Sequence, residues 1–121
     1  MNLDGAPVLD HGVLAELRAA TGDDEAFMRE LVETYVSEGE SNLAGLLDAA
    51  ATQDCVAIIR PAHTLKSTSA SVGAMRLSVI CRSIEENGRA SRADTLSADA
   101  ELARATWQAT LAALTEAGLR G

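Results

Sequence analysis

Apolar residues recur at steps of three or four along most of this 121-residue chain, and no segment shows the strict two-residue alternation of a half-buried strand. The composition agrees with this pattern, because alanine and leucine are abundant whereas only three residues are aromatic. Alanine and leucine favour helices, while strands depend on β-branched and aromatic side chains. The sequence therefore predicts an all-α protein without a sheet.

Capping residues and glycines divide the chain into one short helix and four longer ones. Asp10 can cap a first helix over residues 8–21, which Gly22 ends. Leu9 and Leu14 stand at the positions of a hydrophobic staple. The longer helices are predicted over residues 23–52, 54–72, 74–86 and 96–117. Such helices, joined by short turns, form an antiparallel up-down four-helix bundle with the short helix laid across one end.

Particular residues support the inner boundaries of this bundle. Asp54 is the expected N-cap of the helix that runs to Val72, and Asn87 and Gly88 are the expected C-cap pair of the next helix. Pro61 lies far enough inside its helix to remove a backbone hydrogen bond, so a local kink is expected there. No second domain is indicated, and residues 1–121 are predicted to form a single domain.

Composition also excludes several classes of function. The formal net charge of -8 disfavours a nucleic-acid binder, which needs a basic face. No phosphate-binding glycine motif, secretory signal or membrane-spanning apolar run occurs. Cys55 and Cys81 belong to no paired motif and are expected to be reduced, which favours a cytoplasmic location. No Glu-x-x-His pair exists, so a di-iron site is also excluded.

Charge is distributed unevenly along the chain. Residues 1–54 hold twelve acidic side chains and two arginines, whereas residues 55–92 hold two glutamates and six basic side chains. The helices predicted over residues 54–72 and 74–86 therefore form a basic hairpin within an acidic protein. Such a hairpin either balances the acidic helices beside it or handles a negatively charged group.

The first helix of this hairpin carries a histidine whose surroundings suggest chemistry. On a helical wheel His63 lies opposite Val72, which belongs to the apolar side, so the imidazole is expected to face solvent. Lys66, the only lysine, follows one turn later and can share a ligand with the ring. A neutral imidazole is a nucleophile, and a nearby cation can stabilise a phosphoryl group carried on it. Taken alone, such a pair is more often two solvated side chains than a site.

The other side chains of this sector suit the approach of a partner protein. Ser67 and Ala70 are small enough to allow close approach to the ring, and Val56 and Ile59 would give the partner an apolar anchor. Arg60 lies at the edge of the sector and adds positive charge. The sequence thus predicts a docking surface around His63.

The stretch Ala62–Ala74 reads AHTLKSTSASVGA and closely resembles the phospho-acceptor helix of the histidine phosphotransfer (HPt) family, whose pattern is A-H-x-L-K-G-x-S-x-x-x-G-A. The resemblance covers nearly the whole chain. It also includes Phe27, Leu31, Leu77, Cys81, Ile84, Glu85 and Arg89. The four-helix bundle of that family agrees with the architecture predicted from the periodicity.

The resemblance implies a multistep two-component phosphorelay. His63 would accept a phosphoryl group from an aspartate of one receiver domain and pass it to another, and Lys66 would be the cation beside that group. Glu85, on the neighbouring helix, would stand near the imidazole, and Gly73 would end the acceptor helix. The chain would be a monomeric phosphocarrier without kinase activity, nucleotide site or cofactor, because the Mg²⁺ ligands belong to the receiver partner. Ser67 departs from the family's usual glycine, which leaves room for a partner but can change its affinity.

Two other functions stay open at this point. The chain could be the acceptor domain of a larger histidine kinase, phosphorylated directly from ATP by a separate catalytic domain, although its start at Met1 favours a free-standing protein. It could also be a helical bundle that binds receivers without chemistry. The dimerisation helix of sensor kinases is a poorer match, because Thr64 follows His63 and no proline comes after it.

Overall fold

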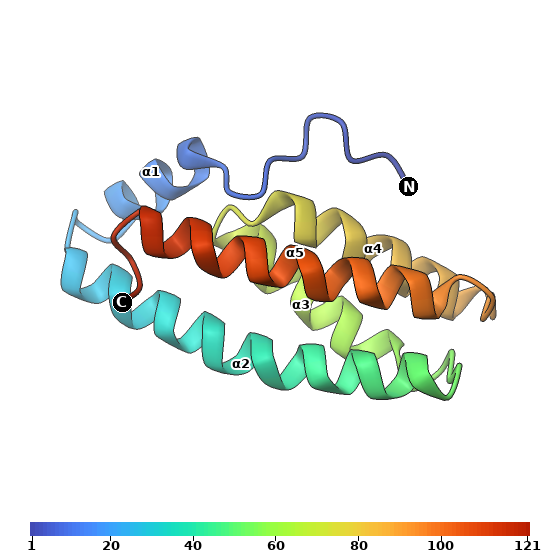
Figure 1. The fold of residues 1–121 in the computed structure, drawn as a ribbon. Coiled ribbons are helices and arrows are strands. Elements are labelled where there is room, and N and C mark those ends of the chain that lie inside the picture. The colour runs from blue at the N-terminus through green and yellow to red at the C-terminus, as the bar shows by residue number, and fades with distance from the viewer.

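The computed structural model describes all 121 residues and contains helices but no strand. The helices are α1 (His11–Ala20), α2 (Glu25–Ala51), α3 (Ile59–Ser71), α4 (Met75–Arg89) and α5 (Leu96–Glu116). The four longer helices pack in a cycle, with α2 against α3 and α5, and α4 against α3 and α5. Figure 1 shows α1 at one end of this bundle, where α2 begins and α5 ends. The predicted all-α, antiparallel four-helix bundle with a short extra helix is confirmed.

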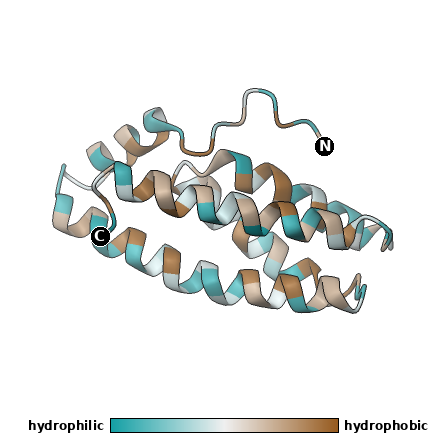
Figure 2. Ribbon diagram, viewed as in Figure 1, coloured by the Kyte–Doolittle hydropathy of each residue, from teal (hydrophilic) through white to brown (hydrophobic).

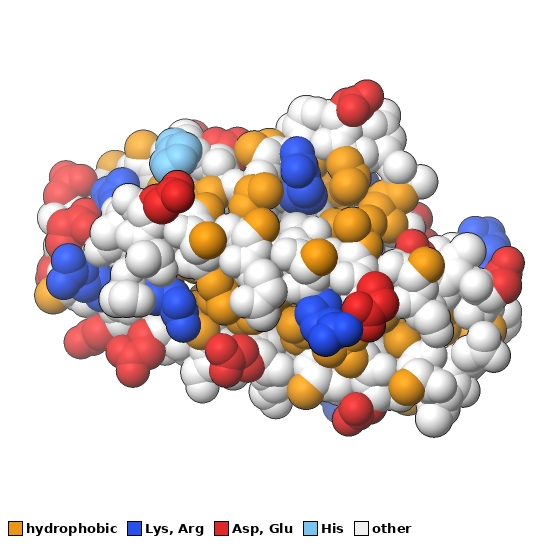
Figure 3. All heavy atoms as spheres, in the orientation of Figure 1, with side chains coloured by type: hydrophobic (Ala, Val, Ile, Leu, Met, Phe, Trp, Pro, Cys, Tyr) orange, Lys and Arg blue, Asp and Glu red, His pale blue; other side chains and the backbone are white.

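Hydrophobic and hydrophilic residues alternate along each helix, as amphipathic helices of a bundle require (Figure 2). The buried apolar residues form one continuous core to which all five helices contribute. Figure 3 shows acidic side chains gathered at the end of the bundle where α1 meets α2, in agreement with the acidic residues of that part of the sequence. No helix has both the length and the apolar character that crossing a membrane requires.

The centre of the core joins α2 to α5 and α3 through two aromatic rings. Trp107 packs so closely on Gly39 that a Cβ at this glycine would lie 2.3 Å from the indole ring. Tyr35 stacks at a tilt on Trp107, with ring centroids 5.5 Å apart, and its hydroxyl lies 2.8 Å from Ser69 Oγ. Burial raises the pKa of the Tyr35 hydroxyl well above its usual range, so this group stays neutral. Trp107 thus packs α5 against α2, and the Tyr35–Ser69 contact joins α2 to α3.

The predicted cap and staple of the first helix are confirmed, although α1 spans His11–Ala20 rather than residues 8–21. The Asp10 side chain accepts hydrogen bonds from the backbone N–H groups of Gly12 and Val13, and Leu9 and Leu14 are both buried. The backbone N–H of Asp10 donates to the Gly73 carbonyl at 2.7 Å. Gly73 has φ +87°, and a Cβ there would lie 2.8 Å from the Asp10 carbonyl oxygen. The turn between α3 and α4 is therefore held by the N-terminal segment as well as by its own glycine.

Three predicted details of the helices are wrong. Asp54 caps a turn, through a bond from the Ala57 N–H, and α3 begins only at Ile59. Pro61 consequently lies in the first turn of α3, where a backbone N–H has no intrahelical partner, and it causes no interior kink. The helix α4 does not end at Asn87.

The last of these differences has a steric explanation. Gly88 lies inside α4 and is buried, and a Cβ at this position would lie 2.8 Å from the Cys55 carbonyl oxygen. The glycine therefore serves the close approach of the turn before α3 rather than a helix end. Phe27, near the start of α2, is 42% exposed, and the buried face of α2 runs through Met28 and Val32.

The two cysteines are free thiols, as predicted. Cys81 is fully buried, and burial raises the pKa of its thiol to about 12. Since the thiolate is the reactive form, this cysteine behaves as a small apolar core residue.

Candidate functional site

The face of α3 that the helical wheel assigned to solvent is the exposed face in the structure. His63 is exposed over 55% of its side chain, whereas Ala62 and Leu65, on the opposite side of the helix, are fully buried. Ser69 and Val72 continue the buried side toward the end of α3. The imidazole therefore projects from the bundle surface, on a helix whose other side is packed into the core.

A buried carboxylate from α4 organises the surroundings of His63. Glu85 Oε2 lies 3.0 Å from His63 Nδ1, and Glu85 Oε1 accepts a hydrogen bond from Lys66 Nζ at 2.7 Å. Arg89, one turn further along α4, donates to Oε2 through Nη2 at 2.9 Å and through Nε at 3.2 Å. The Glu85 side chain is only 8% exposed. Glu85 thus joins α3 to α4 directly beneath the exposed ring.

This carboxylate is ionised at neutral pH. Burial disfavours its charged form, but the hydrogen bonds from Lys66, Arg89 and His63 lower the pKa of Glu85 from its usual value near 4.5 to about 2. An ionised carboxylate only accepts hydrogen bonds, so Nδ1 must be the donor in its contact with His63. In the neutral imidazole the lone pair then lies on Nε2, on the side of the ring directed away from Glu85. The site therefore presents one defined nitrogen as a nucleophile.

A further contact fixes the register of the two helices that carry the site. The Ser78 hydroxyl of α4 donates to the Lys66 carbonyl of α3 at 2.9 Å. The hydrogen bond crosses the interface near the turn formed by Gly73. It holds the backbone of Lys66 in place while the ammonium group reaches Glu85.

The other predicted site residues surround His63 in the expected sector. Val56 is 80% exposed, the largest exposed fraction among the large apolar side chains, and it lies in the turn before α3. Arg60 and Ser67 are exposed, and Ile59 and Ala70 are half-buried. Their exposure is compatible with a docking surface, and their part in docking stays a prediction.

Sequence reasoning missed two features of this site. It placed Lys66 beside a future phosphoryl group but did not foresee that Glu85 binds the ammonium first. It quoted Arg89 without a role, although Glu85 and Arg89 stand at the i, i+4 spacing at which opposite charges pair on a helix. This spacing of Glu85 and Arg89 could have predicted an ion pair on α4 from the sequence.

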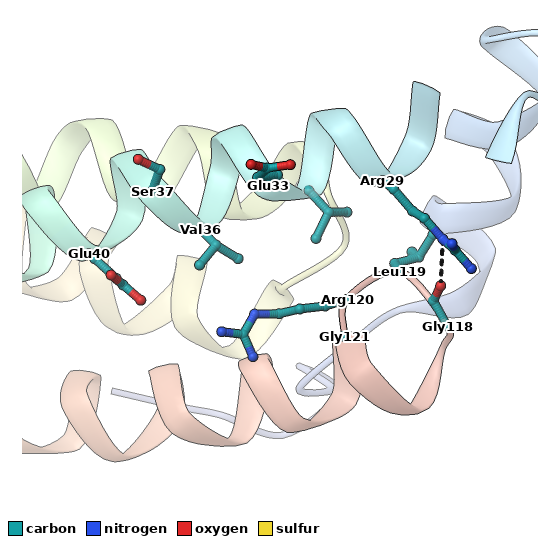
Figure 4. A pocket seen from close by; sticks show the side chains of 10 residues that line it. Arg29, Glu33, Val36, Ser37, Glu40, Gly118, Leu119, Arg120 and Gly121 are labelled. Carbon is teal, nitrogen blue, oxygen red and sulfur yellow. Dashed lines mark hydrogen bonds between the residues drawn. The ribbon is translucent and has the colours of Figure 1, made fainter. Parts of the chain in front are cut away.

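The site is an open surface rather than a pocket. Four hollows on the surface of the molecule are lined by other residues, and none of them includes His63, Lys66 or Glu85. The hollow in Figure 4 has a volume of about 630 Å³ and lies between α2 and the C-terminal segment, where Arg29 donates to the Gly118 carbonyl. No group of three or more His, Cys, Asp and Glu side chains is arranged to hold a metal ion. An exposed nucleophile outside these hollows suits a protein partner better than a small molecule.

Comparisons with known proteins agree with this geometry. The sequence model of the Hpt domain family matches residues 30–117, so the chain belongs to the Hpt domain family. Its fold is similar to the crystal structure of histidine-containing phosphotransfer protein B (HptB) from Pseudomonas aeruginosa PAO1. The TM-score is 0.83 at 28% sequence identity, and the match covers 93% of this chain and 95% of that chain.

A curated protein from a second organism is also similar in sequence to this chain. Multistep phosphorelay regulator 1 of Schizosaccharomyces pombe is 29% identical over 82 residues, which are 67% of this chain. The match covers only 28% of that relative. The family predicted from the stretch Ala62–Ala74 is confirmed.

Proposed function

We propose that this chain is a phosphocarrier of a multistep phosphorelay in which His63 accepts a phosphoryl group from the aspartate of one receiver domain and passes it to the aspartate of another. The observation that carries the proposal is the exposed imidazole whose Nδ1 donates to the buried Glu85, which leaves Nε2 as the free nucleophile. Membership of the Hpt domain family and the likeness to a protein named as a phosphorelay regulator support it.

The transfer step follows from this arrangement. Nε2 of His63 attacks the phosphorus of an aspartyl phosphate, the Nε2–P bond forms, and the P–O bond to the aspartate breaks with its electron pair returning to the carboxylate. The proton on Nδ1 stays in its bond to Glu85 throughout the step, so Nε2 is the nitrogen that attacks. Lys66 lies one turn from His63 and can neutralise charge on the phosphoryl oxygens. The return step is the same displacement in reverse.

The partner completes the reaction. A receiver would supply the aspartate and the Mg²⁺ ion, and it would dock on the surface formed by Val56, Ile59, Arg60, Ser67 and Ala70. In this proposal the chain acts as a cytoplasmic monomer and has neither a cofactor nor kinase activity of its own. Phosphorylation directly from ATP by a separate kinase domain is the alternative for the source of the phosphoryl group.

Substitution of the acceptor tests the proposal. Wild-type protein, His63→Gln and His11→Gln are each incubated with phosphorylated receiver domains and Mg²⁺, and in parallel with a kinase core and ATP. His11 is the matched control, because it is the only other histidine and is also exposed. We expect base-stable, acid-labile label on the wild type and on His11→Gln, and none on His63→Gln. Label that persists in His63→Gln would overturn the proposal, and label only from ATP would select the alternative.

A further inference from the structure

Glu85 is a single carboxylate shared by three donors, and two of them take part in the proposed transfer. Its oxygens accept from His63 and Lys66 on α3 and from Arg89 on α4. Because the carboxylate is nearly inaccessible to solvent, water does not replace these bonds. The charge and the hydrogen bonds of Glu85 are therefore coupled to the protonation and phosphorylation of the His63 ring.

The first consequence concerns the ring as a leaving group. A phosphoryl group on Nε2 leaves readily when Nδ1 carries a proton, because the ring then departs as neutral imidazole instead of the strongly basic imidazolate. Glu85 holds that proton on Nδ1 at 3.0 Å. The carboxylate thus favours departure of the phosphoryl group from His63.

The second consequence concerns Lys66. Its ammonium group can neutralise a phosphoryl group on His63, but it already donates a hydrogen bond to Glu85 Oε1 at 2.7 Å. A phosphoryl group and Glu85 would compete for this one cation, and they carry charges of the same sign on two sides of one imidazole ring. Both effects raise the free energy of the phosphorylated state relative to the free histidine.

We propose that Glu85 is a positioning residue that shortens the lifetime of the phosphoryl group on His63, so that the site passes the group on rather than stores it. The inference deepens the proposed function and rests on it. In the departure step the Nε2–P bond breaks and its electron pair returns to Nε2. The phosphorus bonds to a receiver carboxylate or to water, which then releases a proton to solvent. The Nδ1 proton stays in place throughout.

The lifetime can be measured without a partner protein. Phosphoramidate, a small-molecule donor for histidine, is used to phosphorylate the wild type, Glu85→Gln and Glu86→Gln, and the decay of base-stable label is followed at one pH. Glu86 is the matched control, because it is the next residue of α4, is exposed and loses the same charge. We expect a half-life at least about fivefold longer in Glu85→Gln, the size of a modest like-charge effect, and an unchanged half-life in Glu86→Gln.

The outcomes separate this inference from the proposed function. Label on all three proteins with equal half-lives would overturn the role of Glu85 alone, whereas a wild type that takes no label on His63 would overturn the proposed function. If circular dichroism shows that Glu85→Gln is unfolded, Glu85→Asp replaces it in the experiment. Aspartate keeps the charge, but its side chain is one methylene shorter and its carboxylate lies further from His63. A half-life longer than that of the wild type is expected for this variant too, and an unchanged one counts against the inference.

A spectroscopic measurement tests the positioning itself. The ¹⁵N chemical shifts of the unphosphorylated His63 ring report which nitrogen carries the proton. We expect the Nδ1–H form to dominate in the wild type and in Glu86→Ala, and to give way to a mixture of the two forms in Glu85→Ala. The same mixture in all three proteins would show that Glu85 does not position the ring.

Discussion

The bundle has two halves, the helix pair α2 and α5 and the helix pair α3 and α4, and different forces hold the helices of each pair together. The helices α2 and α5 meet through apolar shape complementarity, with the Trp107 ring placed against Gly39. The helices α3 and α4 share apolar packing too, but their surface is joined by Glu85, which binds side chains from both. Apolar packing between α2 and α5 contributes to stability. The charged contacts between α3 and α4 link stability to the chemistry of His63, so substitutions in the two halves should have different consequences.

Loss of the Glu85 charge is expected to have the widest effect, because it changes stability, the pH dependence of stability and the surroundings of His63. The pKa of Glu85 is lowered in the folded protein, so its contribution is fully present above pH 4.5 and is lost as the pH falls through about 2. At pH 7, Glu85→Gln should lower the free energy of unfolding by about 2 kcal/mol, less than the full shift would give because Lys66 and Arg89 are partly exposed. Urea unfolding at a series of pH values measures this difference. A difference between wild type and variant that stays constant from pH 7 to pH 2 would contradict the assigned pKa.

Substitution of two glycines in α2 tests the packing between α2 and α5. Gly39→Ala places a methyl group against the Trp107 ring and should cost about 1–3 kcal/mol of stability. Gly45→Ala is the matched control in the same helix, because its Cβ would come no closer than 3.8 Å to Pro61 and it should stabilise α2 by up to about 1 kcal/mol. Thermal unfolding measures both. Folded Gly39→Ala should still accept a phosphoryl group at the wild-type rate, and a slower rate would show that the two halves are not independent.

The smallest expected effect on stability, with a clear effect on chemistry, belongs to Lys66. Lys66→Ala removes a cation that is 28% exposed and should change the free energy of unfolding by no more than about 1 kcal/mol. Loss of a charge-assisted contact to the phosphoryl group should slow transfer by about tenfold. Stopped-flow or rapid-quench phosphotransfer gives the rate, with Arg104→Ala as the control, because Arg104 is an exposed cation of α5 outside the docking surface. Loss of stability without loss of rate would mean that Lys66 serves the fold alone.

Much of the architecture followed from local chemistry. The Asp10 cap, the staple of Leu9 and Leu14, and the exposed face around His63 depend on short-range patterns, and the structure has each of them. The errors at Pro61 and Gly88 have another origin. Each of these residues has a local preference, but its neighbours in space decide its role.

The charged centre of the site shows the same limit. That Glu85 stands near His63 was implied by resemblance to a family, and the distance agrees. The same buried carboxylate also binds Lys66 and Arg89, and these contacts depend on how α3 and α4 are rotated about their axes relative to each other. Helical periodicity predicts which face of each helix is buried, but it does not determine this rotation closely enough to predict the contacts. The three-dimensional structure was needed to find them.

The most direct measurement is the identity of the phosphorylated atom. The protein labelled with ¹⁵N in its histidines is phosphorylated, and the coupling between ³¹P and ring nitrogen is recorded by NMR. Phosphorus bonded to Nε2 of His63, with the proton retained on Nδ1, is the predicted result. Phosphorus on Nδ1, or on a hydroxyl such as that of Ser67, would contradict it.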